Sequence, residues 1–174
     1  MRYFLITLLT VFLLTSCVSQ PEGVTPVESF ELNRYLGKWY EIARLDHSFE
    51  EDLTHVTAHY SLDEDGNVTV INRGYDAQKS EWSEAEGTAK FVDSPDVGFL
   101  KVSFFGPFYG SYIVFELDQD YQHAFVAGPN TDYLWLLSRQ PTVPDALTQK
   151  FENQAQTLGF HIDQLIYVDQ SERP

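Results

Sequence analysis

The feature that most constrains the fold is a series of eight strand-like segments joined by short turns. The segments are rich in β-branched and aromatic residues, and clusters of Asp, Asn, Gly and Pro separate them. Short antiparallel links favour an up-and-down arrangement, and closure into a barrel removes the free edges of an open sheet. The sequence therefore predicts an all-β fold, an eight-stranded antiparallel up-and-down barrel. Its strands are one that begins at Gly37 and those at 53–62, 68–75, 80–92, 98–105, 109–117, 123–128 and 133–139.

Two residues at opposite ends of this series predict how the barrel closes. Trp39 follows Gly37 at the start of the first strand, and Arg139 ends the last strand. If the first and last strands pair, the Arg139 guanidinium can lie over the Trp39 ring in a cation–π contact. We expect this contact to seal one end of the barrel.

The hydrophobic period changes after Arg139 from that of a strand to that of a helix. Residues 142–145 carry a helix-capping signal, and Gly159 ends the pattern. A helix with one apolar stripe must cover a sheet face, so we expect it on the outside of the barrel. A short final strand at 165–168 and a helical turn at 30–36, which would plug one end, complete the predicted elements. The stripe consists of Leu147, Phe151, Ala155 and Leu158.

Strand alternation predicts which side chains face the interior, where eight strands leave room for one small ligand. If Trp39 and Arg139 point inward, alternate residues of the last strand do so too, and Leu134 and Leu136 meet the helix. Each apolar residue of this kind also fits an ordinary packed core, and a register slip of one residue would invert a strand. The predicted ligand-binding residues are Ala58, Tyr60, Val70, Val102, Phe104, Tyr112, Val114, Phe125, Tyr133 and Trp135.

The polar residues give little support for catalysis. No Gly-x-Ser-x-Gly stretch is present. His55 and His59 can share one strand face, but no third ligand is close in sequence, so we expect solvated histidines and predict no metal site or other cofactor. Glu41 and Glu116 fall on the interior side by the same alternation, and one of them should then be neutral or paired.

The N-terminus has the pattern of a secretory leader over residues 1–16. Its apolar run, residues 3–14, is shorter than the roughly 20 residues that a membrane-spanning helix needs. The run ends in Leu-Thr-Ser-Cys, which resembles the lipobox of bacterial lipoproteins. That resemblance implies that Cys17 becomes the new N-terminus and carries an S-diacylglycerol and an N-acyl chain as a membrane anchor. An ordinary leader with a chance cysteine is the alternative.

The residues after the leader favour a tether followed by one domain. Val18 stands where an aspartate would retain a lipoprotein at the inner membrane, so the resemblance favours the outer membrane. Residues 17–29 contain Pro and Gly without periodicity, as expected of a lipidated tether, and residues 30–174 suffice for one folded domain. Cys17 is the only cysteine, so no disulfide can form within the chain.

The net charge of −15 limits the classes of binding partner that the protein can have. No basic stripe is present to neutralise phosphates, so nucleic acid is not a predicted partner. An acidic protein is also repelled by anionic membrane surfaces, so membrane attachment must come from the lipid on Cys17. The 15% of aromatic residues need either a packed interior or a ligand.

Three short motifs, in order and at suitable spacing, resemble the conserved regions of the lipocalin family. They are Gly37-x-Trp39-Tyr40, Thr131-Asp132-Tyr133 and Arg139. The stretches 39–44, 46–50, 101–110 and 133–139 are further similar to its bacterial outer-membrane branch. The resemblance covers nearly all of the chain after the leader, and it implies that Gly37, Trp39, Thr131, Asp132 and Arg139 form the structural closure of the barrel.

The same resemblance implies a function. It points to a carrier of single-chain lipids, fatty acids and especially lysophospholipids, that serves membrane maintenance under stress. It also implies a lipid-anchored protein at the periplasmic face of the bacterial outer membrane and allows a homodimer. Two other functions stay open at this stage: a lipid-modifying enzyme, and an envelope-anchored interaction module with a filled core. A membrane-spanning barrel would need uniformly apolar outer rows, which polar residues interrupt here.

Overall fold

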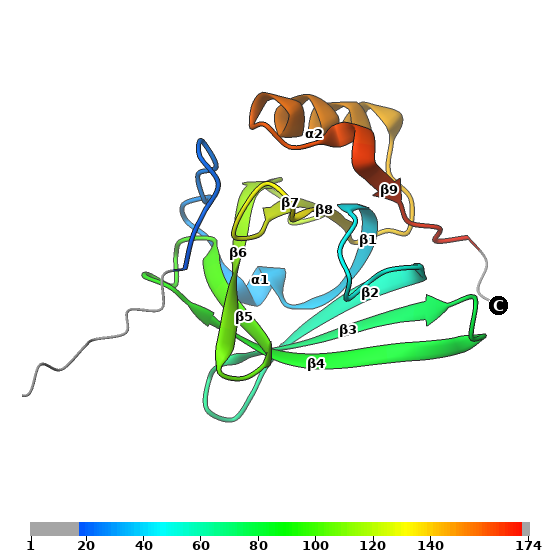
Figure 1. Ribbon diagram of the computed structural model, residues 1–174. Coiled ribbons are helices and arrows are strands. Elements are labelled where there is room, and N and C mark those ends of the chain that lie inside the picture. Colours follow the sequence, from blue (N-terminus) through cyan, green and yellow to red (C-terminus); the bar gives the residue numbers. More distant parts are fainter. Residues whose placement is uncertain (1–17, 172–174) are drawn as a thin grey trace, which may run out of the picture.

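The computed structural model describes residues 18–171, and it forms the predicted barrel of eight antiparallel strands (Figure 1). Strands β2 to β8 pair in sequence order, β8 pairs with β1, and β1 pairs with β2 to close the ring. The predicted final strand is present as β9, which adds to β1. The strands are β1 (Gly37–Leu45), β2 (Leu53–Leu62), β3 (Val68–Asp76), β4 (Glu81–Phe91), β5 (Phe99–Phe105), β6 (Phe108–Leu117), β7 (His123–Ala127), β8 (Leu134–Ser138) and β9 (Leu165–Tyr167).

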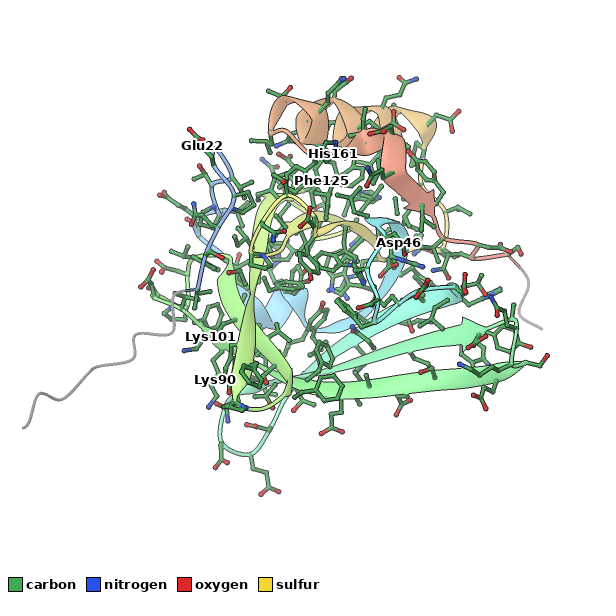
Figure 2. The ribbon with its side chains drawn as sticks, in the orientation of Figure 1. Glu22, Asp46, Lys90, Lys101, Phe125 and His161 are labelled. Carbon is green, nitrogen blue, oxygen red and sulfur yellow. The ribbon has the colours of Figure 1, made fainter. Side chains whose placement is uncertain are left out.

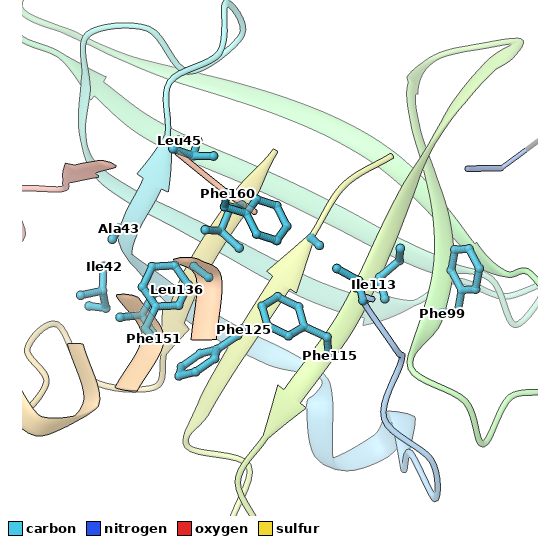
Figure 3. Packing of buried hydrophobic residues seen from close by; sticks show 14 residues of the cluster. Ile42, Ala43, Leu45, Phe99, Ile113, Phe115, Phe125, Leu136, Phe151 and Phe160 are labelled. Atoms are coloured by element: carbon cyan, nitrogen blue, oxygen red, sulfur yellow. The ribbon is translucent and has the colours of Figure 1, made fainter. Parts of the chain in front are cut away.

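The C-terminal helix α2 (Asp145–Thr157) packs on the outside of the barrel, as predicted (Figures 1 and 3). Its stripe residues Phe151 and Ala155 are fully buried, and the Phe151 ring lies 5.0 Å from that of Phe125 on β7. No side chain caps the helix, so the capping signal at 142–145 is not used. No helix within residues 18–171 has both the length and the apolar character needed to cross a bilayer.

The barrel is closed at one end by the predicted contact between the first and last strands. The Arg139 guanidinium lies 3.9 Å from the centre of the Trp39 ring, and Trp39 is fully buried. The short helix α1 (Leu32–Tyr35) plugs this end, and the Trp39 indole N–H donates a hydrogen bond to the Tyr35 carbonyl over 2.8 Å. Gly37 has a φ of +93°, a conformation that favours glycine, and its missing side chain leaves space beside Arg139.

Thr131 and Asp132 do not take part in this closure, contrary to the prediction. They lie in the turn between β7 and β8, and β8 separates them from the Arg139 end of the barrel. The Asn130 side chain accepts a hydrogen bond from the Asp132 backbone N–H over 2.9 Å, so the motif orders a turn at the open end.

Residues 18–29 do not form the free tether that the composition predicted. Val24 is buried in the hydrophobic cluster between the barrel and α2 that also contains Phe151. Glu28 forms a β-bridge with Val97, and the Val27 N–H donates a hydrogen bond to the Val114 carbonyl over 2.8 Å. The Ser19 hydroxyl donates to the Pro129 carbonyl over 3.0 Å. The described chain therefore lies along the barrel from its first residues. Cys17 and the leader lie outside the described residues.

The barrel wall is incomplete between β4 and β5. Pairing of these strands covers only Thr88 to Phe91 of β4 with Leu100 to Ser103 of β5. The preceding residues, 81–87, pair with β3 on the other side. In Figure 1 the long strands β2, β3 and β4 accordingly extend away from the β5–β6 hairpin.

Candidate functional site

A cavity of about 280 Å³ lies inside the barrel, above the closed end. Its lining is mostly apolar and aromatic, which is typical of a site for a small apolar ligand. The residues come from β1, β2, β3, β5, β6 and β8 and from the loops at the open end. They are Glu41, Phe49, Glu50, Val56, Ala58, Tyr60, Val70, Asn72, Val102, Phe104, Gly110, Ser111, Tyr112, Pro129, Tyr133, Trp135 and Leu137.

Three tyrosines connect the cavity to the closed end. The Tyr112 hydroxyl lies 2.7 Å from that of Tyr35 and 2.8 Å from that of Tyr60, which makes a chain of two hydrogen bonds. Tyr60 and Tyr112 line the cavity, and the Tyr35 ring packs against Trp39 in a tilted arrangement, with ring centres 4.7 Å apart. Burial raises the pKa of all three hydroxyls, so the chain is neutral. The bottom of the cavity is therefore polar but uncharged.

A bulge in β1 brings two charged residues to the inside of the barrel. Glu41 pairs with Leu137 of β8 and Ala43 pairs with Leu136, so the register shifts at Ile42. In a regular strand, residues three apart face opposite sides, and the bulge cancels this alternation. Arg44 and Glu41 therefore meet at 2.8 Å in an ion pair that is almost fully buried.

Burial raises the pKa of the Glu41 carboxyl well above its ordinary value, and the nearby charge of Glu50 raises it further. The charge of Arg44 and its hydrogen bond act in the opposite direction but are smaller than the effect of burial. One arginine faces two buried carboxyl groups here, and this excess of acidic over basic groups favours the neutral form of Glu41 more than an isolated ion pair would.

Glu50 reaches the cavity from the loop between β1 and β2. Its carboxylate lies 3.3 Å from the Trp135 indole nitrogen and 3.4 Å from the Asn72 side-chain nitrogen. His47 Nε2 lies 3.2 Å from the same carboxylate, but neither ring nitrogen of His47 has a hydrogen-bond partner. The His47 ring stacks at 3.8 Å on Phe49. This loop therefore contributes a buried carboxylate and an aromatic wall.

The cavity continues through the gap in the barrel wall into a side opening of about 510 Å³. The two spaces share Phe49, Glu50, Val56, Asn72 and Phe104. The β5–β6 turn borders the opening with Phe105 and Phe108, which are 78% and 80% exposed. An apolar chain inside the barrel would thus have a route out between β4 and this turn.

Most of the predicted ligand-binding residues lie around this cavity. Two do not. Val114 is buried in the hydrophobic cluster inside the barrel, which also contains Trp39, but it does not line the cavity. The inward placement of Phe125 is wrong, because Phe125 lies on the side of the barrel that faces α2 (Figure 2). It pairs with Leu136 and packs in the same cluster (Figure 3). The lining residues are Ala58, Tyr60, Val70, Val102, Phe104, Tyr112, Tyr133 and Trp135.

Two predictions about polar strand residues are also wrong. Glu116 does not face the interior, since a bulge opposite Phe125 turns it outward and it meets Lys150 of α2 at 2.6 Å. His55 is not solvated; it is 8% exposed, has a φ of +53° and lies edge-on to Trp82. Within residues 18–171, no three His, Cys, Asp or Glu side chains are grouped to hold a metal ion.

Sequence reasoning missed Glu50 and Phe49 as site residues. Both lie in a loop, where strand alternation gives no direction. A signal was present in the cluster of one histidine, one phenylalanine and two glutamates between two strands, but only the fold shows that the loop turns back over the cavity.

Comparison with known proteins agrees with this geometry. The family model for the lipocalin-like domain matches residues 30–170. The chain is 58% identical over 171 residues to the outer membrane lipoprotein Blc of Vibrio cholerae, covering 98% of this chain and 99% of the relative. It is 51% identical to the outer membrane lipoprotein Blc of Escherichia coli K12, with 91% of each chain covered.

More distant proteins are also similar, in sequence or in structure. Temperature-induced lipocalin-1 of Arabidopsis thaliana is 32% identical and covers 90% of this chain and 88% of its own. The solved structure of insecticyanin from the tobacco hornworm Manduca sexta superposes with a TM-score of 0.69 at 20% identity, with 88% of each chain covered. The family match, these relatives and the closed barrel with its internal cavity together show that this chain belongs to the lipocalin family.

Proposed function

We propose that this protein is a carrier of single-chain lipids, fatty acids and lysophospholipids, held at the bacterial outer membrane through Cys17. The observation that carries the proposal is the apolar cavity inside the closed barrel, together with its opening between β4 and the β5–β6 turn. A binding role needs no catalytic group, and we propose binding rather than catalysis.

The energetics favour a single acyl chain. Burying about ten methylene groups gives a gross gain of roughly 8 kcal/mol, but a bilayer offers the chain a similar gain. Net affinity must therefore come from the shape of the cavity and from its few polar groups. The narrow interior suits one chain, since a second would have to displace the packed rings of Phe104, Tyr112 and Trp135.

The docked N-terminal segment supports attachment close to a membrane. Ser111, which lines the cavity, donates a hydrogen bond to the Ser19 carbonyl. The Ser19 hydroxyl in turn donates a hydrogen bond to the Pro129 carbonyl. Cys17 is only two residues before Ser19, a reach of about 7 Å. A lipid on Cys17 would thus keep the cavity near the bilayer, where the carried lipids are. The names of the Vibrio and Escherichia relatives agree with this location.

We propose the periplasmic face and a role in membrane maintenance under stress on the same family grounds. A second copy of this chain is a further proposed partner. Sedimentation of the chain from residue 18 tests that homodimer, because a dimer would double the mass independently of any ligand.

Native mass spectrometry of the chain from residue 18 tests the proposed carrier. We expect one single-chain lipid to be retained per protein molecule. Replacing Trp135 with leucine should weaken lipid binding several-fold and leave the fold intact, because Trp135 is a half-buried wall residue. An interaction module with a filled core would retain no lipid, and a lipid-modifying enzyme would convert the added lipid.

A further inference from the structure

The two charged residues that line the cavity are both acidic. Glu41 and Glu50 are the only charged side chains among its described lining residues. Among the described residues that line the adjoining side opening, Arg73 is the one cation; it is exposed and lies 4.3 Å over the Trp82 ring. A carboxylate ligand inside the cavity would therefore meet charges of its own sign.

The two glutamates differ in how well they are neutralised. Glu41 has its own cation, Arg44, at 2.8 Å. Glu50 is 5% exposed, and the His47 ring lies 3.2 Å from its carboxylate without forming a hydrogen bond to it. The two hydrogen bonds that Glu50 does accept, at 3.3 and 3.4 Å, are at the weak end of the range for nitrogen donors. A carboxylate can accept about four hydrogen bonds, so Glu50 has unused capacity next to the cavity.

Aromatic rings line the cavity together with this carboxylate, and the His47 ring stacks on one of them, Phe49, at 3.8 Å. The rings of Phe49 and Tyr133 are 6.4 Å apart and nearly parallel, and Tyr133 and Trp135 are 6.2 Å apart. All three residues line the cavity with Glu50. Aromatic faces attract cations, most strongly where water is excluded. A carboxylate beside several rings is thus suited to a positively charged nitrogen.

From this arrangement we propose that the cavity selects single-chain amphiphiles whose head carries a cationic amine, held by Glu50 against Phe49, Tyr133 and Trp135. The proposal rests on the proposed function and ranks its ligands by head group, with amine-bearing lysophospholipids ahead of fatty acids. The amine adds a positive charge beside Glu50, whose nearest basic group is the His47 ring with Nε2 at 3.2 Å. The acyl chain enters the apolar part of the cavity toward Tyr60 and Val102.

The test compares three ligands that share a twelve-carbon chain. Dodecylammonium, dodecanoate and 1-monododecanoylglycerol are titrated into the chain from residue 18, which contains every described element, with calorimetry below their micelle concentrations. We expect dodecylammonium to bind about tenfold or more tightly than dodecanoate, with the neutral ester between them.

Two variants with the same change in net charge separate a site from the general acidity of the protein. Glu50→Gln should bring the two ions to within about twofold of each other. Glu64→Gln, which changes an exposed residue of the β2–β3 turn, should preserve the preference. Equal or tighter binding of dodecanoate to the unmodified chain would overturn the proposal, as would a preference that survives Glu50→Gln.

A third variant covers the case in which Glu50→Gln does not fold. Phe49 is 53% exposed, so Phe49→Leu should fold. Leucine keeps the apolar contact but removes the aromatic face, so dodecylammonium should bind several-fold more weakly while the neutral ester stays within about twofold. Equal weakening of both ligands would count against the cation site. If the ester binds without any cation preference, only this inference fails; if none of the three binds, the carrier function fails with it.

Discussion

The guanidinium of Arg139 lies over the ring of Trp39 and also binds the backbone beneath it. It donates hydrogen bonds to the carbonyls of Arg34, Tyr35 and Leu36 at 2.9 to 3.0 Å and to that of Lys38 at 2.7 Å. These carbonyls belong to the C-terminal end of α1 and the start of β1, where the helix leaves acceptors without partners. One side chain therefore seals the ring and caps the helix that plugs it.

We expect Arg139→Lys to destabilise the protein by about 2–4 kcal/mol. A lysine ammonium is a point charge that cannot serve four carbonyls in the planar geometry of a guanidinium. Arg34→Lys is the matched control, because Arg34 also lies over a ring, that of Tyr121 at 4.1 Å, but is exposed. Urea unfolding should give a loss below about 1 kcal/mol for the control. If Arg139→Lys loses as little stability as the control does, a positive charge of any shape is sufficient for the closure.

Tyr112→Phe should cost about 2–3 kcal/mol of unfolding free energy. The change removes both hydrogen bonds of the tyrosine chain and leaves the Tyr35 and Tyr60 hydroxyls without their partner. Tyr109→Phe, on the same strand, is the control, since the Tyr109 hydroxyl makes no hydrogen bond within residues 18–171 and the ring is only partly buried. Chemical unfolding at pH 7 measures both, and a loss below about 0.5 kcal/mol for Tyr112→Phe would contradict the buried chain.

The raised pKa of Glu41 predicts a pH dependence with a definite sign. The unfolded chain releases this proton near its ordinary pKa, whereas the folded chain keeps it to higher pH. The folded state then binds more protons, so stability falls as pH rises above about 4.5, by about 1.4 kcal/mol per pH unit, until the folded state also ionises. Glu41→Gln lacks this proton and should become more stable relative to the unmodified protein as pH rises.

Urea midpoints between pH 4 and pH 8 measure this difference. Glu64→Gln serves as the reference, since it removes an exposed carboxyl of the same type. A constant difference between Glu41→Gln and the unmodified protein over the whole range would mean that Arg44 keeps Glu41 ionised in the fold.

Alanine substitutions at Phe125 and Phe104 should affect protein stability and lipid binding to different extents. Phe125→Ala removes a fully buried ring between the barrel and α2 and should cost about 3–5 kcal/mol with little effect on lipid affinity. Phe104→Ala changes a half-buried cavity wall and should alter affinity for the neutral ester at a smaller stability cost. Thermal unfolding and ligand titration of both variants test this, and weaker binding by a folded Phe125→Ala would place its ring near the ligand after all.

The sequence was sufficient where a regular pattern controls the structure. The turns between strands predicted the meander, and the pairing of first and last strands brought Arg139 to Trp39. Alternation also placed Tyr133 and Trp135 of the last strand correctly, because that strand is regular up to Arg139.

Irregular backbone explains the predictions that were wrong. The bulge in β6 opposite Phe125 turned Glu116 outward. Every residue of β7 after His123 is apolar, so the hydrophobic pattern of that strand could not show that Phe125 faces out. The bulge at Ile42 likewise put Arg44 beside Glu41. The segment 18–29 looked like a tether because its composition shows no periodicity. Its backbone hydrogen bonds to Val114 and Gly98 and its bridge to Val97 cannot be read from composition.

The gap beside β4 leaves a row of backbone groups that another chain could pair with, which is the usual start of sheet-to-sheet aggregation. This exposed edge carries Glu81, Glu84 and Glu86, and a second copy approaching in register would bring the same acidic residues against them. The glutamates thus discourage polymerisation at this edge, and neutralising them should make the protein less soluble before it makes it less stable.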